Sequence, residues 1–191
     1  KFRISDALMS IYKLFWDEYC AWYLEAVKPA YGESIDKATY GATIIFFEKL
    51  LKMIHPVMPF ITEELWQSMA ERKEGETIMY QPTPKAGSVD ERIIEEFGIA
   101  QEAVNGIRGI RQQKNISPKE ALALKVKGDF PMNMLPVVTK LANISSVESV
   151  ADFGDAAGVS LLVRTVELFV PLEGLVDVEE EIKKIETELE H

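Results

Sequence analysis

Basic and amide side chains in the second half of the chain are spaced in a way that suits the binding of phosphate groups. Arg108, Arg111 and Asn115 follow one another at three- and four-residue steps, and Lys114 lies on the neighbouring face of the same predicted helix. Such steps place side chains next to one another on an α-helix. Guanidinium groups donate paired hydrogen bonds to phosphate oxygens. The pattern therefore predicts a helix face that contacts a nucleic-acid backbone.

Two glycines in the same stretch, Gly106 and Gly109, would let such a backbone come close to the helix. A second interpretation of this stretch stays open. Both arginines could instead form ion pairs with Glu102 or with other acids of the second half of the chain, in which case the basic face would be structural.

The N-terminal residues Lys1, Phe2 and Arg3 form a smaller candidate site. An aromatic ring flanked by cations could stack on an unpaired base and hold its phosphate, and such stacking contributes about 1–3 kcal/mol per base. Alternatively, Phe2 packs on the neighbouring helices.

We expect no catalytic, cofactor-binding or metal-binding residues in this chain. The sequence contains no glycine-rich phosphate loop, no nucleophile motif and no Cys/His set at metal-ligand spacing. His55 precedes Pro56 and has no partner at such spacing, so we interpret it as part of a helix end.

Two long helices are predicted at the start of the chain. The first runs from about Ser5 to Lys28, where apolar and aromatic residues recur at helical spacing on a wide stripe. The second begins after a cap at Ser34 or Asp36 and runs to Ile54.

A corner is predicted directly after the second helix. Pro56 disfavours helical backbone at the residue before it, and Pro59 suits the first position of a new helix. Ile61, Leu65 and Met69 recur every four residues, so we expect them to form the buried face of this third helix. Three helices joined by a short loop and a corner predict an antiparallel bundle.

The later part of the chain mixes helix and strand patterns, so the predicted fold class is α+β. Residues 78–80 are predicted as extended, and 82–87 carry two prolines and a glycine. A helix is expected from about 88 to 115, and strands are expected at 122–127, 144–150, 158–164 and 165–170. Between the first two strands, residues 132–141 predict a short helix opened by Pro131 and strained in its middle by Pro136.

We therefore predict four regions: a helical bundle at 1–80, a linker at 81–87, a small α+β subdomain at 88–172, and the beginning of a coiled-coil helix at 173–191. Asp177 could cap this last helix, and its apolar seam is formed by Val178, Ile182, Ile185 and Leu189. The ending Leu-Glu-His resembles the start of a vector-encoded histidine tag, so we expect the natural chain to continue.

The charge of the chain is negative but uneven. The net charge is −10, which argues against a general polyanion binder. Eight acids and two lysines from Glu173 onward account for −6 of it, so the preceding part retains room for a local nucleic-acid surface. The single cysteine, Cys20, fits a reducing compartment, and no apolar run is long enough to span a membrane. We expect a cytoplasmic protein and a monomer.

Five segments, taken in order, resemble the C-terminal anticodon-binding region of class I aminoacyl-tRNA synthetases, and the valyl-tRNA synthetases most of all. They are the aromatic helix 19–29, the His-Pro-Val-Met-Pro-Phe corner at 55–60, the Ile-Arg-Gly-Ile-Arg helix at 107–111, the Asn-Ile-Ser-Pro turn at 115–118, and Val-Pro-Leu-Glu-Gly-Leu-Val-Asp at 170–177. The chain departs from the family at Ala21, where an Asp is usual, so no polar role is transferred to that position.

The resemblance implies that the parent enzyme attaches valine to tRNA(Val) with ATP and Mg²⁺, in catalytic and editing domains outside this chain. It implies that the present chain binds the anticodon stem and loop, with Phe2, Arg3, Arg108, Arg111, Lys114 and Asn115 as candidate contacts. The same region of an isoleucyl- or leucyl-tRNA synthetase is the nearest alternative. A helical adaptor that binds proteins through its seam, and no RNA, is the alternative of another class.

Overall fold

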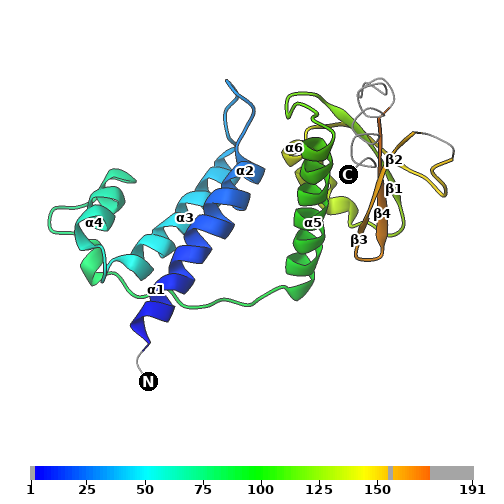
Figure 1. Cartoon of the computed structure of the whole chain (residues 1–191). Helices are drawn as coiled ribbons and strands as arrows, with labels where there is room; N and C mark the ends of the chain where they lie inside the picture. Colours follow the sequence, from blue (N-terminus) through cyan, green and yellow to red (C-terminus); the bar gives the residue numbers. More distant parts are fainter. Residues whose placement is uncertain (1–2, 155–156, 173–191) are drawn as a thin grey trace, which may run out of the picture. The chain divides into compact units, whose positions relative to one another are not determined.

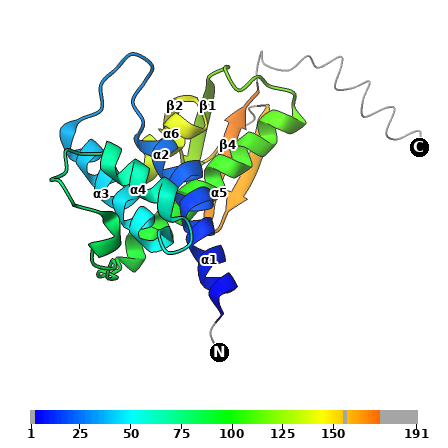
Figure 2. The ribbon, with the colours of Figure 1, turned by 90° about the vertical axis from the view of Figure 1, so that its left-hand side faces the viewer.

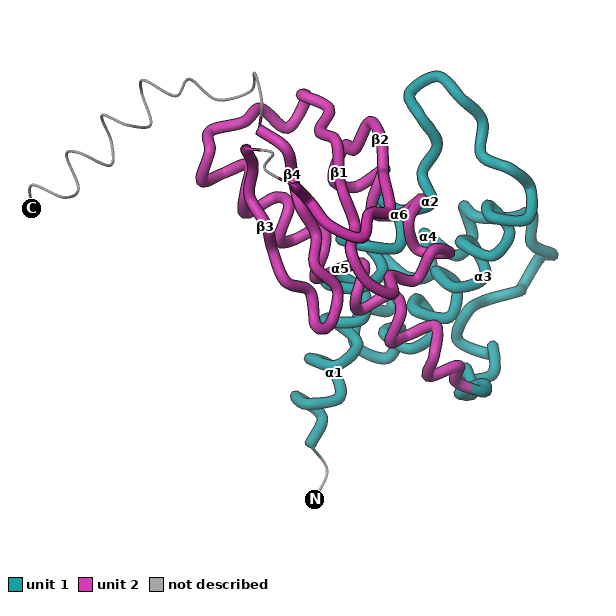
Figure 3. The backbone as a smooth tube through the Cα atoms, turned by 90° about the vertical axis from the view of Figure 1, so that its right-hand side faces the viewer, with its two compact units in different colours: residues 1–88 teal, residues 89–191 magenta. Residues whose placement is uncertain are grey.

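The computed structural model describes residues 3–154 and 157–172, and the chain divides into two compact units, Lys1–Ser88 and Val89–His191 (Figure 1, Figure 3). Unit 1 is helical, and unit 2 combines helices with a small sheet, so the α+β class is confirmed. Phe2, the predicted coiled-coil helix and the tag-like ending lie outside the described residues. None of the helices in the described part of the chain has the length and apolar content that crossing a bilayer requires.

Unit 1 begins with one long helical run that lies beside a second helix (Figure 1). The run consists of α1 (Ile4–Lys13), the π-helical η1 (Leu14–Tyr23) and α2 (Leu24–Val27). The second helix is α3 (Lys37–Ile54), and its cap is Asp36, whose carboxylate accepts a hydrogen bond from the Thr39 amide. Tyr19 is buried between them, and its hydroxyl donates to the carbonyl of Thr43. Burial, reinforced by Tyr23 and Cys20, raises the pKa of Tyr19 to about 12.

The predicted corner joins α3 to α4 (Pro59–Ser68), with Pro59 in the first turn. His55 ends α3, and its Nδ1 lies 2.6 Å from the hydroxyl of Thr62 on α4, so this hydrogen bond spans the corner. Of the predicted buried face of α4, Leu65 and Met69 pack against the core, whereas Ile61 is 48% exposed and the fully buried residues are Thr62 and Trp66. Thr62 tolerates burial because its hydroxyl also donates to the Met58 carbonyl at 2.7 Å.

Trp66 and Ile78 form the core of unit 1 with Leu51. The prediction of an extended segment at 78–80 is wrong, since Ile78–Tyr80 is a 3₁₀ turn, η2. The carboxylate of Glu63 on α4 holds this turn by accepting from the hydroxyl of Thr77 and the amide of Ile78. A contact from another helix therefore overrides the local extended preference.

Three charged side chains lie near the buried indole of Trp66. Its Nε1 donates to Glu48 at 2.7 Å, Lys52 lies 3.2 Å from the same carboxylate oxygen, and the guanidinium of Arg72 lies 3.7 Å from the indole ring centre. Burial alone would raise the pKa of Glu48. The hydrogen bond from Trp66 and the charges of Lys52 and Arg72 lower it by more than this, so the pKa lies below its ordinary value.

Unit 2 places one long and one short helix on a single face of a four-stranded sheet (Figure 1, Figure 2). Its elements are α5 (Glu91–Gln113), β1 (Leu122–Lys127), η3 (Met132–Met134), α6 (Leu135–Leu141), β2 (Ile144–Ser149), β3 (Gly158–Val163) and β4 (Val166–Pro171). The strand order is β2-β1-β4-β3, with β1 and β2 parallel and the other pairs antiparallel. Pro136 falls in the first turn of α6, where proline is tolerated, so the expected strain is absent.

The core of unit 2 forms between α5 and the sheet. Ala103, Val104 and Ile107 on α5 are fully buried, as are Leu122 and Leu168 on the central strands β1 and β4. Alternate residues of a strand point to one face, which is why the alternating pattern of 122–127 was a reliable signal. The packing fixes the C-terminal half of α5 over the sheet and beside α6.

Candidate nucleic-acid interface

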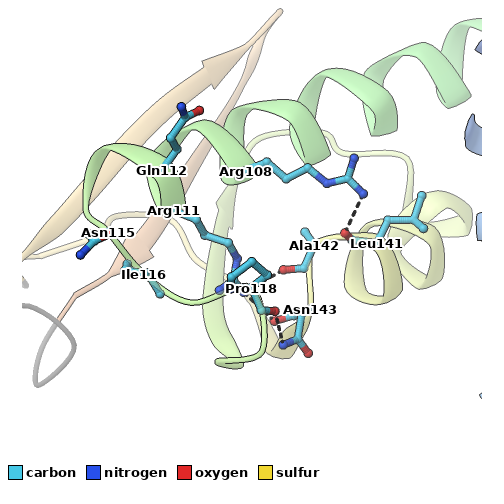
Figure 4. Close-up of a pocket in the computed structure, with 9 residues that line it drawn as sticks. All are labelled: Arg108, Arg111, Gln112, Asn115, Ile116, Pro118, Leu141, Ala142 and Asn143. Atoms are coloured by element: carbon cyan, nitrogen blue, oxygen red, sulfur yellow. Dashed lines mark hydrogen bonds between the residues drawn. The ribbon is translucent and has the colours of Figure 1, made fainter.

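A cavity of about 500 Å³ lies where α5 and α6 both end, and its nine lining residues are labelled in Figure 4. Both helices end close to an asparagine with left-handed backbone, Asn115 with φ of 54° and Asn143 with φ of 52°. Asparagine adopts this conformation more readily than other non-glycine residues, and it commonly terminates helices. The amide of Asn143 donates to the carbonyls of Pro118 and Glu120 at 3.0 and 3.1 Å, which joins the two helix ends.

Arg111 forms the inner wall of the cavity. Its side chain is buried and donates to the backbone carbonyls of Ser117, Ala142 and Asn143 at 2.9 to 3.1 Å. Carbonyls at the end of a helix lack partners within it, and a cation there is favourable. Burial lowers the pKa of Arg111, and the charge of Glu120 opposes that shift. The guanidinium of Arg111 thus donates its hydrogen bonds to the protein's own backbone.

Arg108 lies one turn earlier on the same helix and is exposed. Its Nη2 donates to the carbonyl of Leu141 at 3.1 Å, across the opening of the cavity (Figure 4). Glu102, which the sequence offered as an ion-pair partner for the arginines of α5, accepts from Arg164 in the turn between β3 and β4. The fold therefore places Arg108, Arg111 and Asn115, whose spacing predicted a shared helix face, among the residues that line one cavity.

The other predicted contact residues are placed differently. Lys114 caps the end of α5, is half-buried and does not line the cavity. Arg3 is in unit 1, where it is exposed and forms an ion pair with Asp6. Phe2 lies outside the described residues. Sequence reasoning missed Gln112 and Asn143 as cavity residues, although an asparagine directly after a predicted helix is a signal for a helix end.

The two glycines of α5 have different surroundings. A Cβ on Gly106 would lie 2.7 Å from a methyl carbon of Leu161 on β3, so this glycine serves the packing of the helix on the sheet. The prediction that Gly106 admits a nucleic-acid backbone is therefore wrong. Within the described residues nothing lies within 4 Å of a Cβ placed on Gly109.

The cavity is lined by two arginines and no acid, and the stretch of sequence that contributes its residues is basic, in contrast to the chain as a whole. Residues 103–147 contain seven Lys or Arg and two acids, a local charge of +5. The first half of α5 carries the opposite charge, with four acids at positions 91, 95, 96 and 102. A cavity of about 600 Å³ beside that half is lined by Glu95, Glu96 and Asp129. Of these two cavities of the described residues, the one at the helix ends therefore has the lining that better suits a polyanion.

A model of the anticodon-binding domain of tRNA ligases matches residues 1–127. The chain belongs to this family. The match covers the described helices of unit 1 together with α5 and β1, and so includes both arginines of the cavity. Residues with the geometry of a metal site were not found in 3–154 or 157–172.

Comparison with individual proteins places this anticodon-binding domain near the valine–tRNA ligases. The chain is 52% identical to the enzyme of Phocaeicola vulgatus, 49% identical to that of Parabacteroides distasonis and 48% identical to that of Bacteroides fragilis. Each alignment covers 100% of this chain and 22% of the relative. The chain thus spans about a fifth of the length of these relatives.

Proposed function

We propose that this chain is the tRNA-binding region of a valine–tRNA ligase and that it binds the anticodon stem and loop of tRNA(Val). The observation that supports the proposal most directly is the similarity of the whole chain to valine–tRNA ligases, combined with the anticodon-binding family match. The parent enzyme would join valine to tRNA in the cytoplasm as a monomer. Its ATP, Mg²⁺, catalytic domain and editing domain would belong to parts of the polypeptide outside these residues.

The two units would have different roles in this function. The helices of unit 1 would form an antiparallel bundle that contacts the loop, with Phe2 stacking on an unpaired base and Arg3 near its phosphate. On unit 2, Arg108, Lys114 and Asn115 would hold the RNA backbone, supported by the positive charge of residues 103–147. Arg111 would hold the shape of the cavity through its hydrogen bonds to the backbone carbonyls. The residues after 172 would lead into a coiled coil.

Binding of the anticodon arm by this chain would act on a reaction that takes place in the catalytic domain. A grip on the anticodon arm orients the acceptor end in the catalytic domain, which converts remote contacts into a gain in rate and specificity. This role requires no catalytic residue in the present chain.

The proposal is tested by filter binding of the chain to two transcripts, tRNA(Val) and the same tRNA with its anticodon replaced, at physiological salt. We expect tighter binding of the unaltered transcript by about tenfold or more, since one lost base contact costs about 1–3 kcal/mol. Equal affinities, or no binding of either transcript, would overturn the proposal.

A further inference from the structure

The cavity at the ends of α5 and α6 has the dimensions of a small-ligand site. Its volume of about 500 Å³ lies within the range of about 300–1,000 Å³ that such sites occupy. A nucleic-acid duplex, which is about 20 Å across, cannot enter it, whereas one splayed nucleotide can. The RNA that meets this surface would therefore have to place an unstacked residue there.

The walls of the cavity combine the two kinds of group that bind unstacked nucleotides. Ile116, Pro118 and Leu141 supply an apolar wall, and Arg108 and Asn115 supply a guanidinium and an amide. Single-stranded RNA is recognised by this combination, because bases stack on apolar or guanidinium planes while amides hydrogen-bond to base edges. The wall residues come from the turn after α5 and from the last turn of α6, so only the folded unit assembles them.

The cavity is held open by internal hydrogen bonds. Arg111 bonds to three carbonyls, and the Asn143 amide bonds to two more, so the two helix ends keep a fixed separation. A preformed site avoids the entropic cost of ordering side chains on binding. The buried guanidinium of Arg111 adds a fixed positive charge behind the apolar wall.

Two other cavities of the described residues serve as comparisons. One, in unit 1, is about 150 Å³ and is lined by apolar residues of α1, α3 and α4, apart from Thr62. The other, about 600 Å³, carries three carboxylates and lies beside the first half of α5. The first carries no cation, and in the second Arg92 is outnumbered by the three carboxylates. The cavity at the helix ends is lined by two arginines and no acid, so its chemistry, and not its size, distinguishes it.

We infer that the cavity between the ends of α5 and α6 receives one unpaired nucleotide of the bound RNA, with its base against Ile116, Pro118 and Leu141 and its phosphate near Arg108. This inference rests on the proposed function, which supplies the RNA. It assigns to unit 2 an RNA contact of its own, in addition to the contact proposed for the helices of unit 1.

The first test uses the four nucleoside monophosphates, with inorganic phosphate as the comparison probe. Each is titrated into the chain while ¹H–¹³C spectra of the Ile116 and Leu141 methyl groups are recorded. We expect at least one nucleoside monophosphate to shift both methyl groups with saturation, and inorganic phosphate to leave them in place. If inorganic phosphate gives the same shifts, or no nucleotide moves either methyl, the base does not enter and the inference is overturned.

The second test uses variants of the same helix and measures affinity for tRNA(Val). Asn115→Gly removes the amide but keeps the left-handed backbone that glycine adopts freely, and Arg108→Gln removes the cation. Arg92→Gln removes an exposed arginine of the acidic cavity and serves as the matched control. We expect about a tenfold loss of affinity for the first two variants and no change for the control.

The outcomes separate this inference from the proposed function. If the unaltered chain binds tRNA(Val) and discriminates its anticodon, but Asn115→Gly and Arg108→Gln bind as well as the control, the cavity is not an RNA contact and the inference fails alone. If the unaltered chain binds no tRNA, the proposed function fails first. Thermal unfolding of each variant shows whether any loss of affinity follows from a loss of fold.

Discussion

At the scale of the residue, Arg111 is a cation that is 5% exposed and lies at the inner wall of the cavity. Its hydrogen bonds go to three backbone carbonyls at the ends of two segments. Desolvating a guanidinium is costly, and the three carbonyl dipoles that accept from it offset this cost, although those of Ser117 and Asn143 also accept from backbone amides. Arg108, three residues earlier, makes one such bond from an exposed position. Arg108 and Arg111 are neighbours on one face of α5, but Arg111 is a buried structural cation and Arg108 is exposed.

We predict that Arg111→Ala lowers the free energy of unfolding of unit 2 by about 2–4 kcal/mol, because it removes three hydrogen bonds of a buried guanidinium, one of them to the buried carbonyl of Ala142. Arg111→Lys should recover only part of this, since an ammonium cannot reproduce the planar fork. Urea unfolding followed by circular dichroism measures both. Arg108→Ala is the control and should cost less than about 1 kcal/mol. Equal losses at 108 and 111 would contradict the distinction.

The sequence could place both arginines on one helix face but could not assign their partners. Spacing determines which side chains are neighbours on α5, yet the carbonyls that Arg111 satisfies belong to residues 31 and 32 positions later. The same limit applies to Gly106, whose neighbour Leu161 lies on β3. Contacts between segments far apart in the chain decide these roles, and local patterns do not contain them.

At the scale of the element, α5 contains two glycines that should respond differently to the same substitution. Alanine is favoured over glycine inside a helix by about 0.5–1 kcal/mol. Gly109 has open space at its Cβ position, whereas at Gly106 a methyl of Leu161 occupies that position. The packing on β3 therefore offsets the gain at 106.

We predict that Gly109→Ala raises the free energy of unfolding by about 0.5–1 kcal/mol, and that Gly106→Ala gives a smaller gain or a loss. Thermal unfolding of the two variants under identical conditions measures the difference. Gly41→Ala in α3, where the Cβ position is also open, is a further control and should resemble Gly109→Ala. A more stable variant at 106 than at 109 would contradict this account.

Elements with strong local signals were predictable, and those held by distant contacts were not. Pro56 and Pro59 determine the corner between α3 and α4 through backbone sterics alone. The alternation in residues 122–127 likewise predicted β1, because one face of that strand is buried. The turn at 78–80 was mispredicted, since Glu63 of α4 holds its backbone. On α4, Leu65 and Met69 pack on the core as predicted, but Ile61 is exposed and a hydrogen-bonded threonine, Thr62, is buried beside it in the sequence.

At the scale of the whole molecule, the two units can be followed separately. All three tryptophans, at positions 16, 22 and 66, belong to unit 1, so tryptophan fluorescence reports on that unit. Trp66 is also the partner of Glu48, whose pKa is lowered in the folded state. A group with a lowered pKa stabilises the fold above its unfolded pKa, and this contribution is lost as the pH falls through its folded pKa.

We predict that the contribution of Glu48 to the urea midpoint, followed by tryptophan fluorescence, is full and independent of pH above about pH 5 and decreases as the pH falls below about 4.3, the ordinary pKa of glutamate. Glu48→Gln should lower the midpoint at pH 7 and weaken its dependence on pH below 4.3. Glu64→Gln, at an exposed position on α4, is the control. An unchanged pH profile in Glu48→Gln would show that this carboxylate is not the group responsible.

The opposed charges of the two halves of α5 affect what happens before any contact is made. Their centres are separated by about 20 Å of helix, at 1.5 Å per residue. A polyanion that drifts toward unit 2 is repelled from one end and drawn to the other, so it is turned as it approaches. The polyanion would therefore reach unit 2 already oriented toward the end of α5 that lies beside α6. This steering weakens as dissolved ions shorten the reach of the field to about 8 Å at physiological ionic strength.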